Sequence, residues 1–425
     1  MEFKKVLVIS HDSFSRITNN GKTLASLFKD WPPDKIAQLF FQPEEPDFSI
    51  CRNFYQLTDG DRVRKLLGGK GEGTEIRQVQ NARRAKRTPL AHQFIRKHKW
   101  PVFLFLRNVL WIIGNGRTRR LKMWLDEFAP GLVLYTASDS TFSYQIALWV
   151  SRRYKIPLIV YCMDDYVTPR MRIDPFWWIQ LFLVRRLFTR AVNISKKVLV
   201  IGDDMAREYQ AKFKVACIPV MNCLELRALK DKRENRATLK LAYVGALHLG
   251  RWKILGLIGR ALASLSKQEH PASLEIYCTG KLGSKVLKTI SLPPFMRYCG
   301  ALDEKGVQKV LEEADILVHV ESFKKSLRRY TRLSVSTKIP EYLASGKSIF
   351  AVGPGEIASM RYLKSTGGAE LVTEPKIDKI REGVRKLVEN EELRNAMGRK
   401  GYETAAKNHS DIQVRRILAE TLNSL

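Results

Sequence analysis

Short apolar runs alternate along the chain with longer stretches in which apolar residues recur every three or four positions. The short runs have the length and near-continuous hydrophobicity of buried strands, as in KKVLVIS, IAQLFF, LVLYTA, PLIVYCM and KVLVIG. The longer stretches have the period of amphipathic helices, as in STFSYQIALWVSRRY and DDMAREYQAKF. Alternating strands and helices predict a parallel sheet that is covered by helices on both faces.

The same pattern starts again after the polar run RALKDKRENRATLK. The second series contains LAYVGAL, KILGLIGRALASL, SLEIYCTG, MRYCG, DEKGVQKVLEEA, DILVHV and AELVT. A chain of 425 residues is also too long for one ordinary core. The sequence therefore predicts an α/β protein with two doubly wound parallel-sheet domains. Ligands of such sheets bind at the carboxyl ends of the strands, so we expect a cleft there between the domains.

These patterns also predict the domain boundaries. We expect an N-terminal domain over residues 1–226, with a basic and apolar insertion at about 62–125. A polar linker over 227–238 leads to a C-terminal domain over 239–408. Residues 409–425 are expected to form a helix that could return to the N-terminal domain.

The charge of the chain demands an anionic partner. The net charge is +30, and the stretch from Arg62 to Lys122 holds 17 Lys and Arg against two acids. Nucleic acid, anionic lipid and a phosphorylated substrate all satisfy this demand. The start, MEFKKVLVIS, enters a strand directly and lacks the features of a signal peptide. Six scattered cysteines without a CxxC pair favour reduced thiols in a cytoplasmic protein: Cys51, Cys162, Cys217, Cys223, Cys278 and Cys299.

The stretch STKIPEYLASGKSIFAVGPG, residues 336–355, predicts an anion site at the start of a helix. Ser336 or Thr337 can cap the helix, and its first backbone N–H groups, together with Lys338, would attract an anion. Glu341 lies one turn further on, where a carboxylate can accept hydrogen bonds from a vicinal diol such as a ribose. The alternative is an ordinary capped helix whose Lys and Glu are solvated.

These residues carry a resemblance to a known family. STKIPEYLASGKSIFAV is similar to the P-S-K-x-x-E-Y-x-A-x-G-K-P-V stretch of GT-B glycosyltransferases of the large retaining family 4. YVGALHLGR, residues 243–251, resembles that family's F-x-G-x-L-x-x-x-K stretch. The resemblance is strong between Leu239 and Leu363. It implies a GT-B fold, in which two Rossmann-like domains face each other across a cleft.

The resemblance also implies roles for individual residues. Arg251 and Lys338 would bind the diphosphate of a nucleotide-sugar donor, with Ser336 and Thr337 beside them, and Glu341 would bind its ribose. Ala301 and Leu302 would flank the base. The chain departs from the family at Leu333, where a second Glu is common, and at Ala246, where the family has Arg. Glu321 could substitute in binding the sugar.

Three further residues end strands or follow them closely. His11, Asp164 and Asp165 stand where substrate-facing groups of parallel sheets lie, so they are candidates to touch the sugar or to deprotonate an acceptor hydroxyl. Solvated or capping carboxylates are the alternative. NNGKT, residues 19–23, lacks the first glycine of a P-loop because Arg16 stands there, which excludes ATP hydrolysis of that kind. Gly21 would instead let this loop approach the donor, or the loop is a plain turn.

The stretch WPVFLFLRNVLWIIGN, residues 100–115, is too short to span a bilayer and is interrupted by Arg107. Basic clusters flank it, which is typical of an element lying in the interface of an anionic leaflet. Candidate lipid contacts are Arg83, Arg84, Lys86, Arg87, Trp100 and Trp111. The stretch PFWWIQLFLVRRLF, residues 175–188, has a similar composition, but we expect it to be a core helix.

The hypothesis that combines these features is a retaining glycosyltransferase, peripherally bound to the inner face of the membrane. It would transfer a sugar from a nucleotide-diphosphate donor to a lipid-linked saccharide in cell-surface polysaccharide biosynthesis. We find no cluster of residues with metal-ligand spacing, so we expect neither a metal nor a cofactor. Two alternatives remain. The first is a basic nucleic-acid-binding protein, although no RRM, KH or zinc-finger signature is found. The second is a GT-B relative that acts as an epimerase or is inactive.

Overall fold

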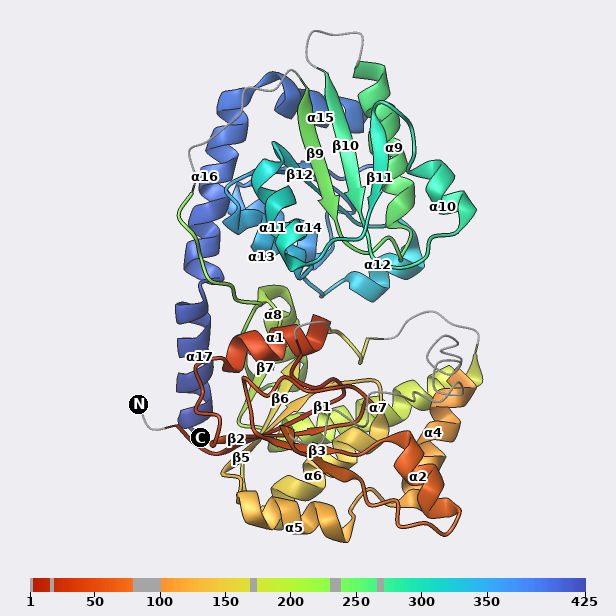
Figure 1. Cartoon of the computed structure of the whole chain (residues 1–425), viewed down its shortest axis with the longest axis vertical. Coiled ribbons are helices and arrows are strands. Elements are labelled where there is room, and N and C mark those ends of the chain that lie inside the picture. The colour runs from red at the N-terminus through yellow and green to blue at the C-terminus, as the bar shows by residue number, and fades with distance from the viewer. Residues whose placement is uncertain (1–2, 16–18, 79–100, 169–173, 230–237, 266–270) are drawn as a thin grey trace. The chain divides into compact units, whose positions relative to one another are not determined.

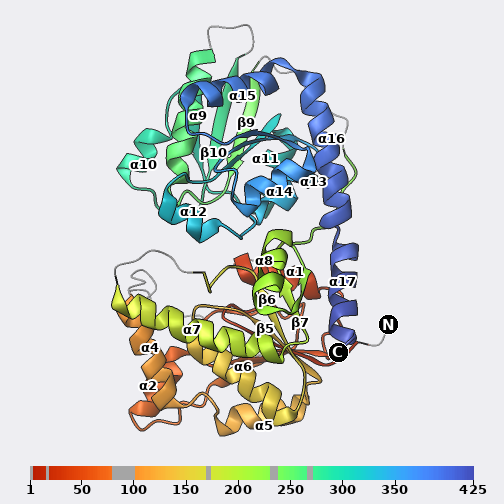
Figure 2. The ribbon, with the colours of Figure 1, turned by 180° about the vertical axis from the view of Figure 1, so that it is seen from behind.

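The computed structural model describes residues 3–15, 19–78, 101–168, 174–229, 238–265 and 271–425. These residues form two units (Figures 1 and 2). Unit 1 comprises Met1–Cys223 together with Val414–Leu425, and unit 2 comprises Leu224–Gln413. The last residues of the chain therefore group with the first domain and not with the second.

Unit 1 contains an eight-stranded sheet in the order β4-β3-β2-β1-β5-β6-β7-β8. Neighbouring strands are parallel except for β4, which runs antiparallel to β3. The strands are β1 (Val6–Ser10), β2 (Ile36–Phe40), β3 (Asn53–Gln56), β4 (Thr74–Ile76), β5 (Leu132–Thr136), β6 (Leu158–Cys162), β7 (Lys197–Val200) and β8 (Ala216–Pro219). The helices are α1 (Asn19–Phe28), α2 (Asp59–Leu66), α4 (Pro101–Gly114), α5 (Arg119–Phe128), α6 (Thr141–Tyr154), α7 (Pro175–Ile194), α8 (Asp203–Phe213) and α17 (Asp411–Asn423).

Unit 2 contains a parallel six-stranded sheet in the order β11-β10-β9-β12-β13-β14. The strands are β9 (Leu239–Val244), β10 (Ala272–Tyr277), β11 (Met296–Gly300), β12 (Ile316–Val320), β13 (Ser348–Val352) and β14 (Ala369–Val372). The helices are α9 (Arg251–Leu265), α10 (Ser284–Thr289), α11 (Glu304–Glu313), α12 (Lys325–Thr331), α13 (Lys338–Ala344), α14 (Ala358–Thr366), α15 (Ile377–Glu389) and α16 (Glu391–Asn408).

Most central strands of each sheet are buried throughout. All five residues of β1, β5, β6, β12 and β13 are buried, because helices cover both faces of the sheets. In unit 2 the two faces form separate apolar clusters, one around α9 and α15 and the other around α13 and α14. In unit 1 one cluster includes four side chains of α17, which are Val414, Leu418, Ala419 and Leu422.

Both sheets have a topological switch point beside their first strand. The chain winds outward in one direction from β1 and then returns to place β5 on its other side, and β9 and β12 have the same relation. In unit 2 the pairing of β9 with β12 ends at Ala242 and Leu317, before either strand ends. The two strands therefore diverge toward their carboxyl ends. This is the place where doubly wound sheets bind ligands.

Candidate functional site

A buried ion pair lies at the switch point of unit 2. Arg251 begins α9 after a loop in which Leu249 and Gly250 adopt positive φ angles of 61° and 75°. The Arg251 Nη2 donates to Oε1 of Glu321, the residue that follows β12, at 2.8 Å. The two side chains are 16% and 3% exposed. The loop after β9 therefore delivers a cation to the end of β12, which places the two residues together although they are 70 positions apart.

The surroundings of this pair change the pKa values of its carboxylate and of a neighbouring imidazole. Burial raises the pKa of Glu321, and the Arg251 guanidinium only partly opposes that shift. His319 Nε2 lies 3.7 Å from Glu321 Oε1. Burial, assisted by Arg251, lowers the pKa of His319 to about 3, so this imidazole is neutral at pH 7. Arg251 is therefore the cation that balances Glu321.

Three buried polar atoms of this cluster have no hydrogen-bond partner within the described part of the chain. They are Arg251 Nε, Glu321 Oε2 and His319 Nε2. A buried polar atom without a partner costs about 1–3 kcal/mol, so such atoms are rare in folded proteins. Their concentration at the carboxyl edge of the sheet is typical of a site whose hydrogen bonds are completed by a ligand.

A second ion pair lies on α13. Lys338 Nζ donates to Glu341 Oε2 at 2.9 Å, and the two side chains are about 30% exposed. The Ser336 hydroxyl accepts a hydrogen bond from the Lys338 N–H at 3.4 Å, whereas no side-chain cap comes from Thr337. Of the two expected capping residues, Ser336 thus meets the first turn. Lys338 and Glu341 are accessible to a ligand.

Tyr342 connects this helix to the switch point. Its buried hydroxyl accepts from the N–H of Val244 at 3.0 Å and lies 3.2 Å from the Val244 carbonyl. The pairing of β9 with β12 has already ended at Ala242, so the Tyr342 hydroxyl, and not β12, bonds to the backbone of Val244. Lys338 and Glu341 are one turn or less from this anchor. This anchor places α13 at the carboxyl end of β9, the strand that the loop to Arg251 follows.

The residues expected to flank the base lie along the same edge. Ala301 and Leu302 directly follow β11, the third strand from the switch point on the side of β10. Ala301 is exposed, and Leu302 packs partly on the cluster that contains Tyr342. Leu333, where the family often has Glu, is buried among apolar side chains. The expected donor residues are therefore brought to one edge of one sheet.

The residues expected at the edge of unit 1 have mixed surroundings. His11 follows β1, and its ring lies 5.5 Å from that of Phe41 and 5.7 Å from that of Phe142. Asp165 is buried and accepts hydrogen bonds from the backbone N–H groups of residues 167 and 168 and from the Tyr209 hydroxyl. These bonds hold the turn after β6. Asp164 beside it is half-buried. Catalytic roles for His11, Asp164 and Asp165 stay predictions.

Two predictions for unit 1 are wrong. Gly21 is a buried residue in the first turn of α1, so it is helical and not part of a loop. Trp111 is 3% exposed and stacks on Phe142, with ring centroids 3.7 Å apart, so its indole faces the interior and not a lipid surface. The other expected lipid contacts lie outside the described residues: Arg83, Arg84, Lys86, Arg87 and Trp100.

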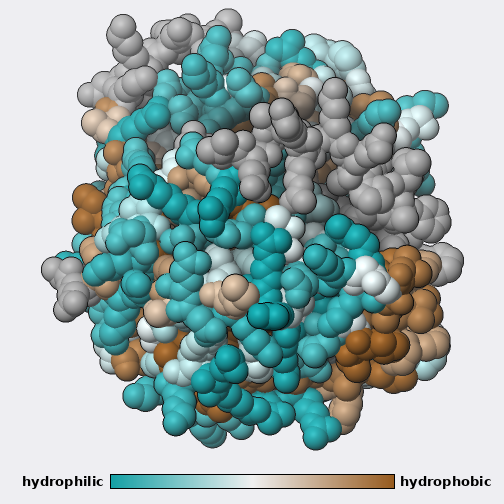
Figure 3. Space-filling view, turned by 60° about the horizontal axis from the view of Figure 1, so that its bottom comes forward, coloured by the Kyte–Doolittle hydropathy of each residue, from teal (hydrophilic) through white to brown (hydrophobic). Residues whose placement is uncertain are grey.

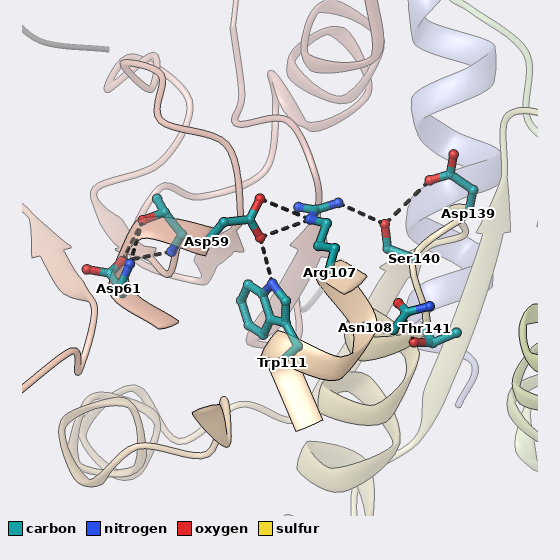
Figure 4. A network of polar contacts seen from close by, with 9 residues as sticks. Asp59, Asp61, Arg107, Asn108, Trp111, Asp139, Ser140 and Thr141 are labelled. Atoms are coloured by element: carbon teal, nitrogen blue, oxygen red, sulfur yellow. Dashed lines mark hydrogen bonds and ion pairs between the residues drawn. The ribbon is translucent and has the colours of Figure 1, made fainter. Parts of the chain in front are cut away.

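A polar network that the sequence analysis missed ties α4 to the rest of unit 1 (Figure 4). Asp59, at the start of α2, accepts from Arg107 Nε at 2.9 Å and from Trp111 Nε1 at 2.6 Å. Arg107 also donates to the Ser140 hydroxyl at 3.1 Å and lies over the Phe142 ring. The capping box of Thr58 and Asp61 indicates only where α2 begins, and it gives no sign that Asp59 contacts α4.

Neither a metal site nor a membrane span is found in the part of the chain that the structure describes. No three His, Cys, Asp or Glu side chains there gather as a metal ion would require. No helix there combines the length and hydrophobicity needed to cross a bilayer.

Comparisons with known proteins match the fold and not the sequence. No protein-family model and no curated protein matches the chain. HepE of Anabaena, solved in complex with UDP, is 11% identical over 99% of this chain and 100% of its own, with a TM-score of 0.64. Sucrose-phosphate synthase of Thermosynechococcus elongatus is 10% identical over 99% and 98%, with a TM-score of 0.66. A trehalose-phosphate synthase of Burkholderia vietnamiensis is 12% identical over 100% and 98%, with a TM-score of 0.61.

These likenesses extend over nearly the whole of each chain and include both units. The chain therefore has the fold of GT-B glycosyltransferases, which is built from two Rossmann-like domains with parallel sheets. The predicted fold is confirmed, as is the resemblance to GT-B glycosyltransferases.

Proposed function

We propose that this protein is a glycosyltransferase that binds a nucleotide-sugar donor at the carboxyl edge of the unit 2 sheet. The proposal depends on two ion pairs at this edge. One joins Arg251 to Glu321, and the other joins Lys338 to Glu341. Two cations at one switch point suit a diphosphate. The fold supports the proposal, because HepE, which has a similar structure, was solved with UDP-glucose.

Each residue of the edge has a role in this proposal. Arg251 and Lys338 bind the diphosphate, with the Ser336 and Thr337 hydroxyls near it. Glu341 exchanges its bond with Lys338 for the two hydroxyls of the ribose. Glu321 holds Arg251 in place through Oε1, and its Oε2, buried without a partner, accepts from a hydroxyl of the sugar. Ala301 and Leu302 border the base.

The proposed reaction breaks the bond between the anomeric carbon and the diphosphate oxygen, and an acceptor hydroxyl forms the new bond with retention of configuration. Charge develops on the departing diphosphate, where Arg251 and Lys338 stabilise it. This cationic pair makes a metal ion unnecessary, so activity should persist in a chelator. His11 and Asp164, at the edge of unit 1, are the candidates to meet the acceptor.

The acceptor in this proposal is the hydroxyl of a lipid-linked saccharide that serves cell-surface polysaccharide assembly. Such an acceptor keeps its lipid in the bilayer, so the enzyme works at the cytoplasmic membrane surface. The net charge of +30 supports this placement, because the inner leaflet is anionic.

Ligand-induced thermal stabilisation tests the donor. A panel of UDP, GDP, dTDP and ADP sugars should contain one that raises the melting temperature, since a ligand at one hundred times its Kd adds about 2.7 kcal/mol. Glu341→Ala should abolish the shift. Glu382→Ala is the matched control, because Glu382 is also bonded to a lysine three positions away, on α15. If no sugar nucleotide stabilises the wild type, while RNA or DNA does, the proposal is wrong.

A further inference from the structure

Helix α4 directs its two polar side chains inward and leaves three of its apolar side chains exposed. Arg107, Asn108 and Trp111 face inward, where Asn108 accepts from Thr141 Oγ1 at 2.7 Å and donates to the side chain of Gln180. Leu106, Ile112 and Ile113 are 53%, 64% and 61% exposed. An amphipathic helix of a water-facing surface has the opposite arrangement.

This orientation is fixed by bonds near the middle of the helix and at its C-terminal end. Asp59 accepts from Arg107 and Trp111 near the middle of the helix (Figure 4). At its end, the fully buried Arg62 donates from Nη1 to the carbonyls of Gly114 and Asn115, each at 2.7 Å. Rotating α4 to bury its isoleucines would break these bonds and leave buried charges unpaired. The exposure of the apolar residues is therefore imposed by the structure.

The neighbouring helices extend the same surface. Helix α7 meets α4 through Phe105 and Phe176, whose rings are 5.7 Å apart, and α2 packs on the other side of α4. We call the exposed apolar side chains of the three helices the apolar face, which includes Leu67, Leu106, Ile112, Ile113, Ile179 and Phe182. It corresponds to the brown area at the lower right of Figure 3.

Cationic side chains border the apolar face. Along one side of α7, the exposed side chains are apolar at Ile179 and Phe182 and cationic further on, at Arg186 and Arg190. Lys70 is exposed three residues after Leu67. Neither α4 nor α7 contains an acidic residue. An apolar centre with a cationic border is the composition of surfaces that enter the interface of an anionic bilayer.

We infer that the apolar face docks on a bilayer that contains anionic phospholipid, with α4 and α7 lying in the interface and Arg186 and Arg190 among the headgroups. This deepens the proposed function, because the lipid-linked acceptor stays in that bilayer. A second copy of the chain suits the face less well. A symmetric pair would bring the two cationic borders together without counter-charge.

Sedimentation of the full-length protein with vesicles tests this inference. The vesicles contain phosphatidylethanolamine and phosphatidylglycerol, and phosphatidylcholine vesicles serve as the neutral reference. The triple variant Ile112→Ser, Ile113→Ser, Phe182→Ser should bind the anionic vesicles at least about tenfold more weakly than the wild type. The matched control changes three exposed apolar residues of other helices, Leu287→Ser, Ile377→Ser and Ile412→Ser, and should bind as the wild type does.

A charge variant separates the two parts of the surface. Arg186→Gln with Arg190→Gln should weaken binding to anionic vesicles about tenfold and leave binding to neutral vesicles unchanged. The inference is overturned if the wild type does not bind the anionic vesicles, or if the triple variant binds them as well as the wild type. It is also overturned if the wild type is a dimer that the triple variant dissociates without any loss of vesicle binding. Donor-induced thermal stabilisation, measured on the same variants, reports separately on the proposed function and should not change.

Discussion

The two sheets share one topology and differ in what stands at their switch points. In unit 2 the edge holds two ion pairs, and buried polar atoms of Arg251, Glu321 and the neighbouring His319 lack a hydrogen-bond partner among the described residues. In unit 1 the edge holds the rings of His11, Phe41 and Phe142. An ion pair of the same unit, Arg107 with Asp59, has further bonds to Trp111 and Ser140. In our proposal the edge of unit 2 binds an anion, whereas the charges of the unit 1 network hold helices together.

This difference separates two uses of a buried ion pair. A pair whose remaining atoms are satisfied by neighbours fixes one arrangement of the chain. A pair with buried donors or acceptors that lack partners lowers the stability of the fold, and a ligand that bonds to those atoms can restore it. The same carboxylate–guanidinium contact therefore serves architecture in one domain and, in our proposal, recognition in the other.

The largest effect is expected from the exposed cation of unit 2. Lys338→Ala removes a charge that stabilises the departing diphosphate, so kcat/KM for sugar transfer should fall about 1,000-fold. Helix α13 should persist, because Tyr342 still bonds to Val244. Initial rates with the donor found in the thermal-shift panel measure the loss.

A second lysine of unit 2 provides the control for this variant. Lys379, on α15, also bonds to a glutamate three positions away, at 3.3 Å, but lies outside the edge. Lys379→Ala should retain wild-type activity. Equal activity of Lys338→Ala and Lys379→Ala would remove the distinction between the edge and the rest of unit 2.

The next effect concerns a buried carboxylate of unit 2 away from the switch point. Glu275 Oε2 is 2.8 Å from Lys240 Nζ and accepts from the Tyr277 hydroxyl, and Arg297 binds its other oxygen. Burial alone would raise its pKa, but the bonds to Lys240, Arg297 and Tyr277 lower it to about 2. Glu275→Gln should therefore lower the free energy of unfolding by about 3 kcal/mol at pH 7.

The pH dependence of this effect has a definite sign. A carboxylate whose pKa is lower in the folded state stabilises the protein above its ordinary pKa, 4.5, and that contribution is lost as the pH falls toward about 2. Denaturant titrations at pH 7, 4 and 2.5 should show the wild type converging on Glu275→Gln. A constant difference between them would contradict the assignment. Glu321 has the opposite shift, since burial raises its pKa.

The smallest effect is expected in the network of unit 1. Arg107→Met removes the cation that bonds to Asp59 and Ser140, so the free energy of unfolding should fall by about 2 kcal/mol. Thermal unfolding measures this loss, while stabilisation by the donor should be unchanged. Arg77→Met is the control, because Arg77 forms an exposed pair with Glu75 at 3.0 Å and should change stability by about 0.5 kcal/mol or less. A loss of donor binding in Arg107→Met would show that the two edges are not independent.

Local sequence patterns predicted the sheets and part of the site. Continuous apolar runs identified the central strands of both sheets, because such strands are buried on two faces. They missed β3, β4 and β8, which lie toward the edges of the first sheet. Lys338 and Glu341 lie within one helix, so their spacing in the sequence already placed them together. The contact between Arg251 and Glu321 could not be predicted in this way. It depends on β9 and β12 being neighbours, which only the order of the strands decides.

The network of unit 1 escaped prediction for a different reason. Sequence patterns assign apolar side chains to the inside and polar ones to water, and α4 reverses both assignments. Arg107 was interpreted as an interruption of an apolar run, although it is the anchor of the helix. Trp111 was expected at a surface, and the Asp59 carboxylate that accepts its N–H comes from another helix. Such pairing over 52 positions has no signature in either segment alone.

Helix α17 imposes an order on the biosynthesis of the first domain. Its last four apolar contacts complete the core of unit 1, yet these residues leave the ribosome only after all of unit 2 has been made. Unit 2 is continuous in sequence and can close as soon as it emerges. The nascent first domain, in contrast, keeps the apolar surface under α17 uncovered until residues 414–422 have been made, so a chaperone that shields that surface would act before they emerge.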